Sequence, residues 1–122
     1  MANGFMWFDV NARSEDVPAV TEFYRALFDG PIGPDDSDGP YAAWMMNGAQ
    51  PWAAVVEASD VTTGRWVPYV HVDDLEGAVA KAIAAGGTVA LPKTAGPAGH
   101  AVTIADPAGA LIALWVPFDT QG

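Results

Sequence analysis

Two residues of the sequence combine an ionisable side chain with a strand-like setting. His71, one of two histidines in the 122 residues, lies between valines in "WVPYVHVDD" (66–74). Asp9 lies in "FMWFDVNA" (5–12), among aromatic and apolar residues. An imidazole in such a place can ligate a metal ion, carry a proton near neutral pH, or sit in a core as a satisfied polar group. The residue types alone leave these three roles open.

Both segments are expected to form β-strands, because each mixes aromatic and β-branched residues over a short run. A strand turns successive side chains to opposite faces. Tyr69 and His71 therefore share one face of the later strand, and the valines that flank His71 share the other. In the earlier strand, Trp7 and Asp9 share the face opposite Phe8.

Tryptophan is abundant, with five residues in the chain. An indole is bulky and its N–H needs a hydrogen-bond partner when it is buried. Taken together, the five tryptophans therefore favour an aromatic-walled ligand pocket or a dimer interface over a water-free core. Four tryptophans lie inside predicted strands and Trp66 begins one. The expected ligand-binding residues are Trp7, Trp44, Trp52, Tyr69, His71 and Trp115.

Charge and composition exclude several classes of function. The absence of cysteine rules out disulfides, thiolate metal sites and a thiol nucleophile. A net charge of −10 repels phosphate backbones and anionic lipids, so no nucleic acid or membrane partner is expected. The sequence has no apolar run of about 20 residues and no signal-peptide pattern at its start, which favours a cytoplasmic protein.

Hydrophobic spacing and turn residues predict the remaining elements. Apolar residues at helical spacing predict a helix over 17–28 that ends near Asp29-Gly30. A second helix is expected after Asp73, which is spaced with Glu76 as a capping box, and ends at Gly86-Gly87. The other expected elements are a loop over 31–40, a hairpin of strands 41–48 and 51–58, a connector over 59–65, a strand over 88–92, a loop over 93–99, and two strands within 100–117.

The order of these elements repeats along the chain. Residues from 66 onward are predicted to form β-α-β-β-β, and the first half follows the same order with its second strand degraded. An internal duplication within a single domain of residues 1–122 is the economical explanation. The two modules would cover about 5–58 and 66–117.

The sequence resembles the vicinal oxygen chelate superfamily, which contains glyoxalase I, bleomycin- and fosfomycin-resistance proteins and extradiol dioxygenases. The resemblance rests on "FYRALF" in the first helix, on "VDDLEGAVAKAIAAGG" and on "ADPAGALIALWVP", in this order. It implies an α+β fold in which two βαβββ modules form one cup-shaped mixed sheet. Helices would lie outside the cup and a ligand cavity inside it. A homodimer is also implied.

The resemblance further implies where metal ligands would lie, on the first, fourth, fifth and last strands. The corresponding positions are Trp7, Glu57, Val67 and Ala113, of which only Glu57 offers a ligand atom. A lone carboxylate cannot hold a divalent ion that requires several ligands. We therefore expect no metal and no other cofactor.

Three functions follow as hypotheses. The first is a protein that binds a small aromatic or apolar molecule in an aromatic-lined cup without a metal. The second is a metal-independent enzyme in which Asp9 and His71, facing a common cavity as the resemblance implies, perform acid-base chemistry; the same pair could instead clamp a phenol or carbonyl. The third is a metal-dependent lyase or dioxygenase with misaligned ligands, drawn from Glu57, His71, Asp9 and His100. His100 is otherwise expected to be exposed, and whether the protein is an enzyme stays open.

Overall fold

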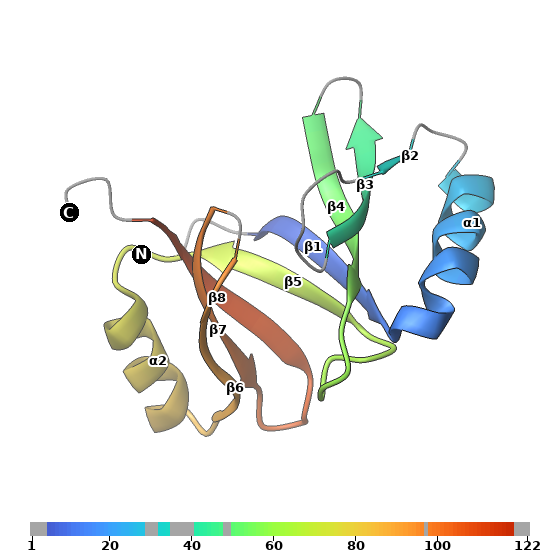
Figure 1. Cartoon of the computed structure of the whole chain (residues 1–122). Helices are drawn as coiled ribbons and strands as arrows, with labels where there is room; N and C mark the ends of the chain where they lie inside the picture. Colours follow the sequence, from blue (N-terminus) through green and yellow to red (C-terminus); the bar gives the residue numbers. More distant parts are fainter. Residues whose placement is uncertain (1–4, 29–31, 35–40, 48–49, 97, 119–122) are drawn as a thin grey trace. The chain divides into compact units, whose positions relative to one another are not determined.

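The computed structural model describes residues 5–28, 32–34, 41–47, 50–96 and 98–118 (Figure 1). A strand, a helix and three further strands follow one another, and the same order then occurs again. The expected α+β class is confirmed. The chain divides into two compact units, called here the N-terminal unit (residues 7–67) and the C-terminal unit (residues 68–118 with Phe5 and Met6).

The N-terminal unit is a mixed sheet with one long helix. Its strand order is β2-β3-β4-β1; β1 and β4 run parallel, whereas β3 is antiparallel to both β4 and β2. A short 3-10 turn, Ser14–Asp16, precedes the helix. The elements are β1 (Phe5–Ala12, from Trp7 onward in this unit), α1 (Val17–Phe28), β2 (Ile32–Pro34), β3 (Tyr41–Asn47) and β4 (Gln50–Glu57).

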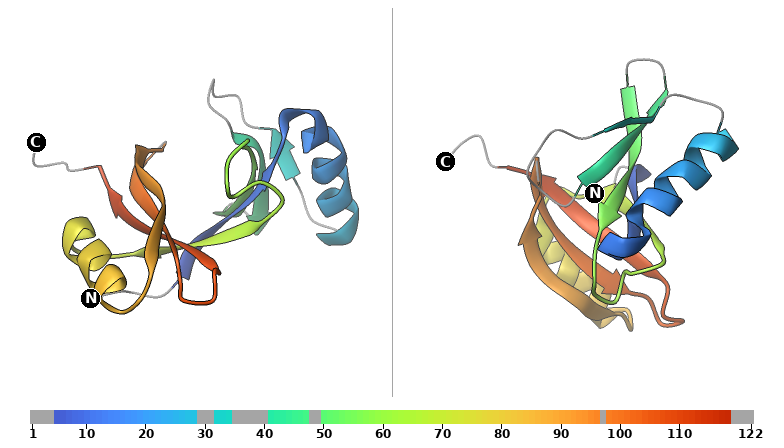
Figure 2. Two further views of the ribbon diagram at one scale, coloured as in Figure 1. Left: turned by 90° about the horizontal axis from the view of Figure 1, so that it is seen from below. Right: turned by 45° about the vertical axis from the view of Figure 1, so that its right-hand side comes forward.

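The C-terminal unit contains four further strands in mixed pairing and a second helix. Its strand order is β5-β8-β7-β6, with β5 and β8 parallel and the other neighbours antiparallel. Both views in Figure 2 show α2 lying against the strands of this unit, and α2 contacts β6, β7 and β8. The elements are β5 (Trp66–His71, which begins in the N-terminal unit), α2 (Leu75–Ala84), β6 (Thr88–Ala95), β7 (Gly99–Ala105) and β8 (Leu111–Pro117).

Each unit buries one face of its sheet under its own helix. In the N-terminal unit, Val10, Met45 and Val55 form a buried cluster against which Val17 and Val20 of α1 pack. In the C-terminal unit the buried cluster is made by aliphatic residues of β5 and β7 with Leu75, and α2 covers it. Because side chains alternate along a strand, the residues between the core positions face the other way. This alternation places the candidate site residues.

The start of α2 differs from the expected capping box. The N-cap is Asp74 rather than Asp73, and its carboxylate accepts a hydrogen bond from the Gly77 backbone N–H. Consecutive aspartates give two possible cap positions, and burial of Leu75 against the sheet selects the second. The expected C-terminus is confirmed, because Gly86 follows the last turn with a φ of 104°.

Two segments that were expected to be loops contain strand residues in the structure. Residues 32–34, expected to be part of a loop, form the short strand β2, which pairs with β3 alone among the described strands. Pro34 is tolerated there because an edge strand does not need every N–H in the ladder. β6 continues to Ala95, three residues beyond the expected strand, through an irregular pairing with β7. The predicted hairpin of β3 and β4 is confirmed.

No helix in the described part of the chain has the length and apolar character needed to cross a membrane.

Gly99 marks a close approach between β7 and β8. A Cβ built at this position would meet the carbonyl oxygen of Val116 and lie 2.8 Å from two ring carbons of Trp115. The indole of Trp115 therefore rests over a backbone that has no side chain, and only glycine fits beneath it.

Replacing Gly99→Ala is expected to lower the free energy of unfolding by at least about 2 kcal/mol, because the methyl group overpacks a contact with backbone on one side. Gly96→Ala is the matched control in the same hairpin, since the nearest atom to its added Cβ lies 3.9 Å away. Urea denaturation of both variants measures the difference. Equal stability of the two would contradict the packing described.

Candidate functional site

A buried carboxylate and two tryptophans form a cluster on the face of the N-terminal sheet opposite α1. The indole Nε1 of Trp7 donates a hydrogen bond of 2.6 Å to Oδ1 of Asp9, which is only 3% exposed. The Trp44 ring from β3 meets the Trp7 ring at 66°, with centroids 5.5 Å apart. A buried carboxylate requires hydrogen-bond donors. Asp9 therefore fixes the orientation of the Trp7 indole, and the expected sharing of a face by these two residues is confirmed.

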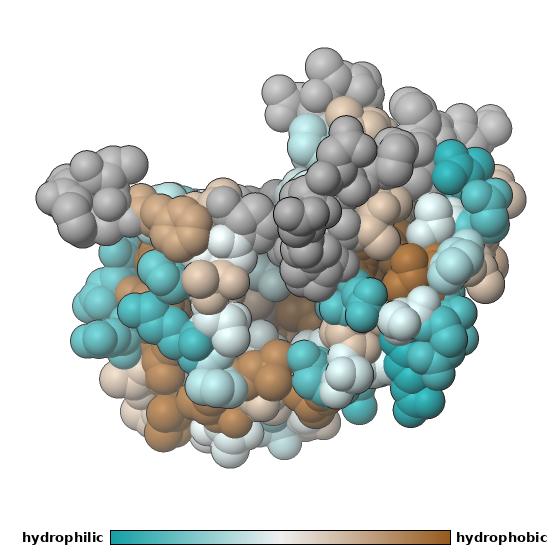
Figure 3. Space-filling model, in the orientation of Figure 1, coloured by the Kyte–Doolittle hydropathy of each residue, from teal (hydrophilic) through white to brown (hydrophobic). Residues whose placement is uncertain are grey.

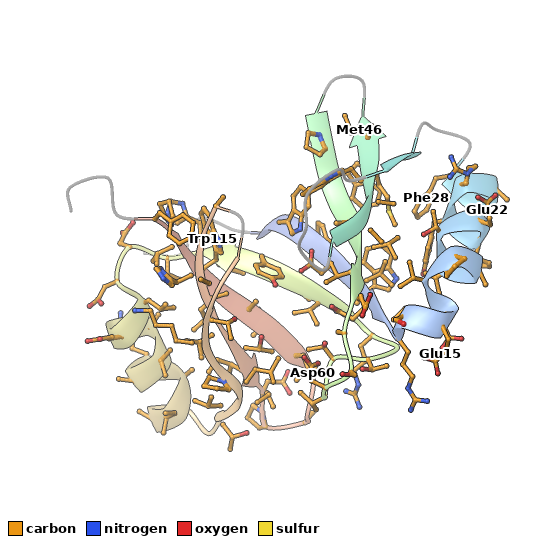
Figure 4. All side chains as sticks on the ribbon, viewed as in Figure 1. Glu15, Glu22, Phe28, Met46, Asp60 and Trp115 are labelled. Atoms are coloured by element: carbon orange, nitrogen blue, oxygen red, sulfur yellow. The ribbon has the colours of Figure 1, made fainter. Side chains whose placement is uncertain are left out.

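A second aromatic group lies on the face of the C-terminal sheet opposite α2. The strand register pairs His71 with Trp115, and their rings lie 5.5 Å apart at 70°. Tyr69 lies two residues before His71 on the same face, and all three side chains are half-buried. Figure 4 shows Trp115 on β8. These three residues, together with the glycine beneath the Trp115 ring, give this unit a fixed aromatic surface with one imidazole.

The catalytic pair expected from the sequence divides between the two units. Asp9 belongs to the N-terminal unit and His71 to the C-terminal unit. Their action on a common cavity stays a prediction. His100, which was expected to be exposed, is half-buried, and its ring contacts Phe118 at a centroid distance of 5.0 Å.

Trp52 does not share the face of Trp7 and Trp44. It packs on the α1 side of the sheet, where its ring contacts Phe8 and Phe28. The cause is a β-bulge: the register passes from Met45–Ala53 to Met46–Pro51, which leaves Trp52 as an extra residue. A bulge shifts the alternation by one residue, so a strict period of two assigns the wrong face to Trp52.

The structure also reveals an aromatic group of which the sequence analysis assigned only Trp52 to a site. Phe23, Tyr24 and Phe28 of α1 gather with Trp52 and Trp66 beside the sheet. The Trp66 indole Nε1 donates a hydrogen bond of 3.0 Å to the Tyr24 hydroxyl. The signal in the sequence was "FYRALF", which places three aromatic rings on one side of a helix. That pattern equally predicts an ordinary core face.

The residues at the four positions where the resemblance implies metal ligands do not fit a divalent ion. Val67 and Ala113 are buried and have no ligand atom, and the indole of Trp7 is a donor only. Glu57 pairs with Ala12 in the register, which places its side chain on the α1 side, away from the face of Trp7. Among the residues that the structure describes, no group of three His, Cys, Asp or Glu could hold a metal ion.

A double-mutant cycle between Trp7→Phe and Asp9→Ala tests the hydrogen bond that fixes the Trp7 indole. The expected coupling in the free energy of unfolding is about 0.5–1.5 kcal/mol, the usual net contribution of an intramolecular hydrogen bond. Chemical denaturation of the two single variants and the double variant measures it. Additive effects of the two substitutions would show that the indole and the carboxylate do not interact.

Comparison with known proteins agrees with the fold. A family model described as a glyoxalase-like domain matches residues 8–115. The chain is 31% identical over 118 residues to proteins named as a glyoxylase, CFP32, in Mycobacterium tuberculosis and Mycobacterium bovis. These matches cover 89% of this chain and 44% of each relative, so the chain spans less than half the length of the curated relatives.

Solved structures with low sequence identity share the fold. A Mn(II)-bound glyoxalase from Novosphingobium aromaticivorans has a TM-score of 0.61 and 17% identity, covering 94% of this chain and 39% of that chain. A glyoxalase I variant from Zea mays has a TM-score of 0.62 and 18% identity, covering 98% and 44%. A glyoxalase/bleomycin resistance protein/dioxygenase superfamily member from Vibrio splendidus has a TM-score of 0.59 and 12% identity, covering 90% and 96%. Since the glyoxalase-like model spans nearly the whole chain, the chain belongs to the glyoxalase-like family of the vicinal oxygen chelate superfamily.

Proposed function

We propose that this glyoxalase-like protein binds a flat aromatic or apolar small molecule without a metal. The ligand would lie on the face of the N-terminal sheet opposite α1, which carries Trp7 and Trp44. Family membership supports a small-molecule ligand, and the residues of this chain determine its chemistry. A homodimer, implied by the resemblance, stays a prediction.

The observation that carries the proposal is the hydrogen bond from the Trp7 indole to the buried Asp9. A ring held by a buried carboxylate keeps its orientation before the ligand arrives. Ordering a free side chain on binding costs about 0.5–1.5 kcal/mol, and a preorganised ring avoids that cost. Trp44 adds a second ring at a steep angle, so a flat ligand can stack on one ring and meet the edge of the other.

In the C-terminal unit, the face opposite α2 offers a polar group of its own, the His71 imidazole. It is half-buried beside Trp115, where it can accept a hydrogen bond from a phenol or donate one to a carbonyl. The net charge of −10 disfavours anionic ligands. An uncharged aromatic compound with a hydroxyl or carbonyl group therefore matches the residues best.

Binding of naphthol, a flat uncharged phenol, tests the proposal. The Trp44→Leu variant is expected to weaken binding by about two- to tenfold, because it removes one aromatic contact worth about 0.5–1.5 kcal/mol. Titration calorimetry measures the dissociation constant for the parent and the variant.

Trp52→Leu is the matched control, since Trp52 lies on the α1 side of the same sheet. It is expected to leave naphthol binding unchanged. Failure of naphthol and a wider panel of flat phenols to bind, or an equal loss in both variants, would contradict the proposed ligand surface.

Metal independence has a separate test. Added manganese, nickel, zinc or ferrous ions are expected to leave the thermal unfolding midpoint unchanged. The reason is that Trp7, Val67 and Ala113 offer no ligand atom, and Glu57 points to the other side of the sheet. Differential scanning fluorimetry with and without a chelator measures this. Stoichiometric metal in the purified protein, together with a raised midpoint, would mean that a different set of residues binds an ion.

A further inference from the structure

Helix α1 covers its sheet face incompletely. It has no fully buried residue, and Phe23 and Phe28 are 58% and 42% exposed. Between α1 and the strands lies a hollow of about 450 Å³, a volume within the range of small-molecule sites. Apolar side chains show beside the polar outer side of α1 in Figure 3. The hollow, called here the helix-side pocket, is lined by one leucine and the aromatic residues Phe8, Phe23, Tyr24, Phe28, Trp52 and Trp66.

The rings of the helix-side pocket form two pairs, and the pairs stand at a steep angle to one another. Trp52 and Trp66 are within 6° of parallel, with centroids 6.4 Å apart. Tyr24 is at 84° to Trp66, so it stands nearly perpendicular to both indoles. Phe28 stacks on Tyr24 at 27°, with centroids 5.4 Å apart, and is at 60° to Trp52. Figure 4 shows Phe28 on the side of α1 that faces the strands, with Glu22 on the opposite side. Rings in this arrangement form two walls rather than one stack.

The chemistry of the walls favours a cation. An aromatic face carries a negative quadrupole and attracts an ammonium group lying within about 6 Å of the ring centre. None of the residues that line the pocket carries a positive charge that would compete for these faces. The Trp66 indole N–H already donates to the Tyr24 hydroxyl, so this indole does not require a polar ligand. The net charge of −10 also raises the local concentration of cations.

We propose that the helix-side pocket binds an organic cation, of the quaternary or alkylated ammonium class. A neutral hydrocarbon would gain burial in the same pocket but no attraction from the ring quadrupoles or the acidic surface. The site is separate from the proposed phenol-binding face, because Trp52 lies on the opposite side of the N-terminal sheet from Trp7.

Choline and its uncharged carbon isostere dimethylbutanol test the proposal, since the two have the same shape and differ in charge. Choline is expected to bind at least about fivefold more tightly than dimethylbutanol, as a partly desolvated cation–π site predicts. Titrations followed by tryptophan fluorescence and by NMR of the indole N–H groups give both dissociation constants.

Two variants locate the site. Phe28→Leu is expected to weaken choline binding by about two- to fivefold, and Trp66→Leu by about tenfold or more. Phe118→Leu is the matched control for Phe28→Leu, because Phe118 is 41% exposed and lies in the C-terminal unit. Trp44→Leu is also expected to leave choline binding unchanged, which separates this site from the phenol-binding face.

Three results would overturn the assignment of a cation. They are absence of choline binding, equal binding of choline and dimethylbutanol, and an equal loss of affinity in Phe28→Leu and Phe118→Leu. The exposed position of Phe28 keeps the test valid if Trp66→Leu fails to fold. Failure of naphthol binding would leave this result unaffected.

Discussion

The alternation of side chains along strands that are buried on one face determines where every candidate residue lies. Once Phe8 and Val10 pack toward α1, Trp7 and Asp9 must face the other way. The same constraint turns Tyr69 and His71 away from α2, because Val70 is in the core beneath that helix. A slip of one residue would exchange the aromatic rings with the aliphatic core, so the burial of the core fixes the register.

This constraint separates the aromatic residues into surfaces of different chemistry. Opposite the helices, rings lie beside ionisable groups: Trp7 beside Asp9, and Trp115 beside His71. On the α1 side, the rings of Trp52 and Trp66 lie among other aromatic and apolar groups. The first setting suits a ligand with one hydrogen-bonding group, and the second suits an organic cation. A count of tryptophans cannot distinguish the two.

Much of the fold could be predicted from the sequence, because the helices and most strands have strong periodic patterns. The faces of Trp7, Asp9 and His71 follow from simple alternation. Trp52 could not be placed, since a β-bulge leaves no pattern in a short apolar run. The helix-side pocket could not be predicted either. The spacing of apolar residues in α1 predicts which residues face the sheet, but not how closely the helix packs on it. The pairing of Asp9 with His71 stays a prediction because the residues lie in separate units.

The most direct test of two separate aromatic surfaces on one sheet is to follow the indole N–H signals of all five tryptophans by NMR while naphthol is added. Single Trp→Phe variants would assign the signals. We expect the signals of Trp7 and Trp44 to shift together with increasing naphthol, while those of Trp52 and Trp66 stay in place. Shifts of Trp52 and Trp66 in step with Trp7 would contradict the account, because they would show that the two faces do not bind ligands separately.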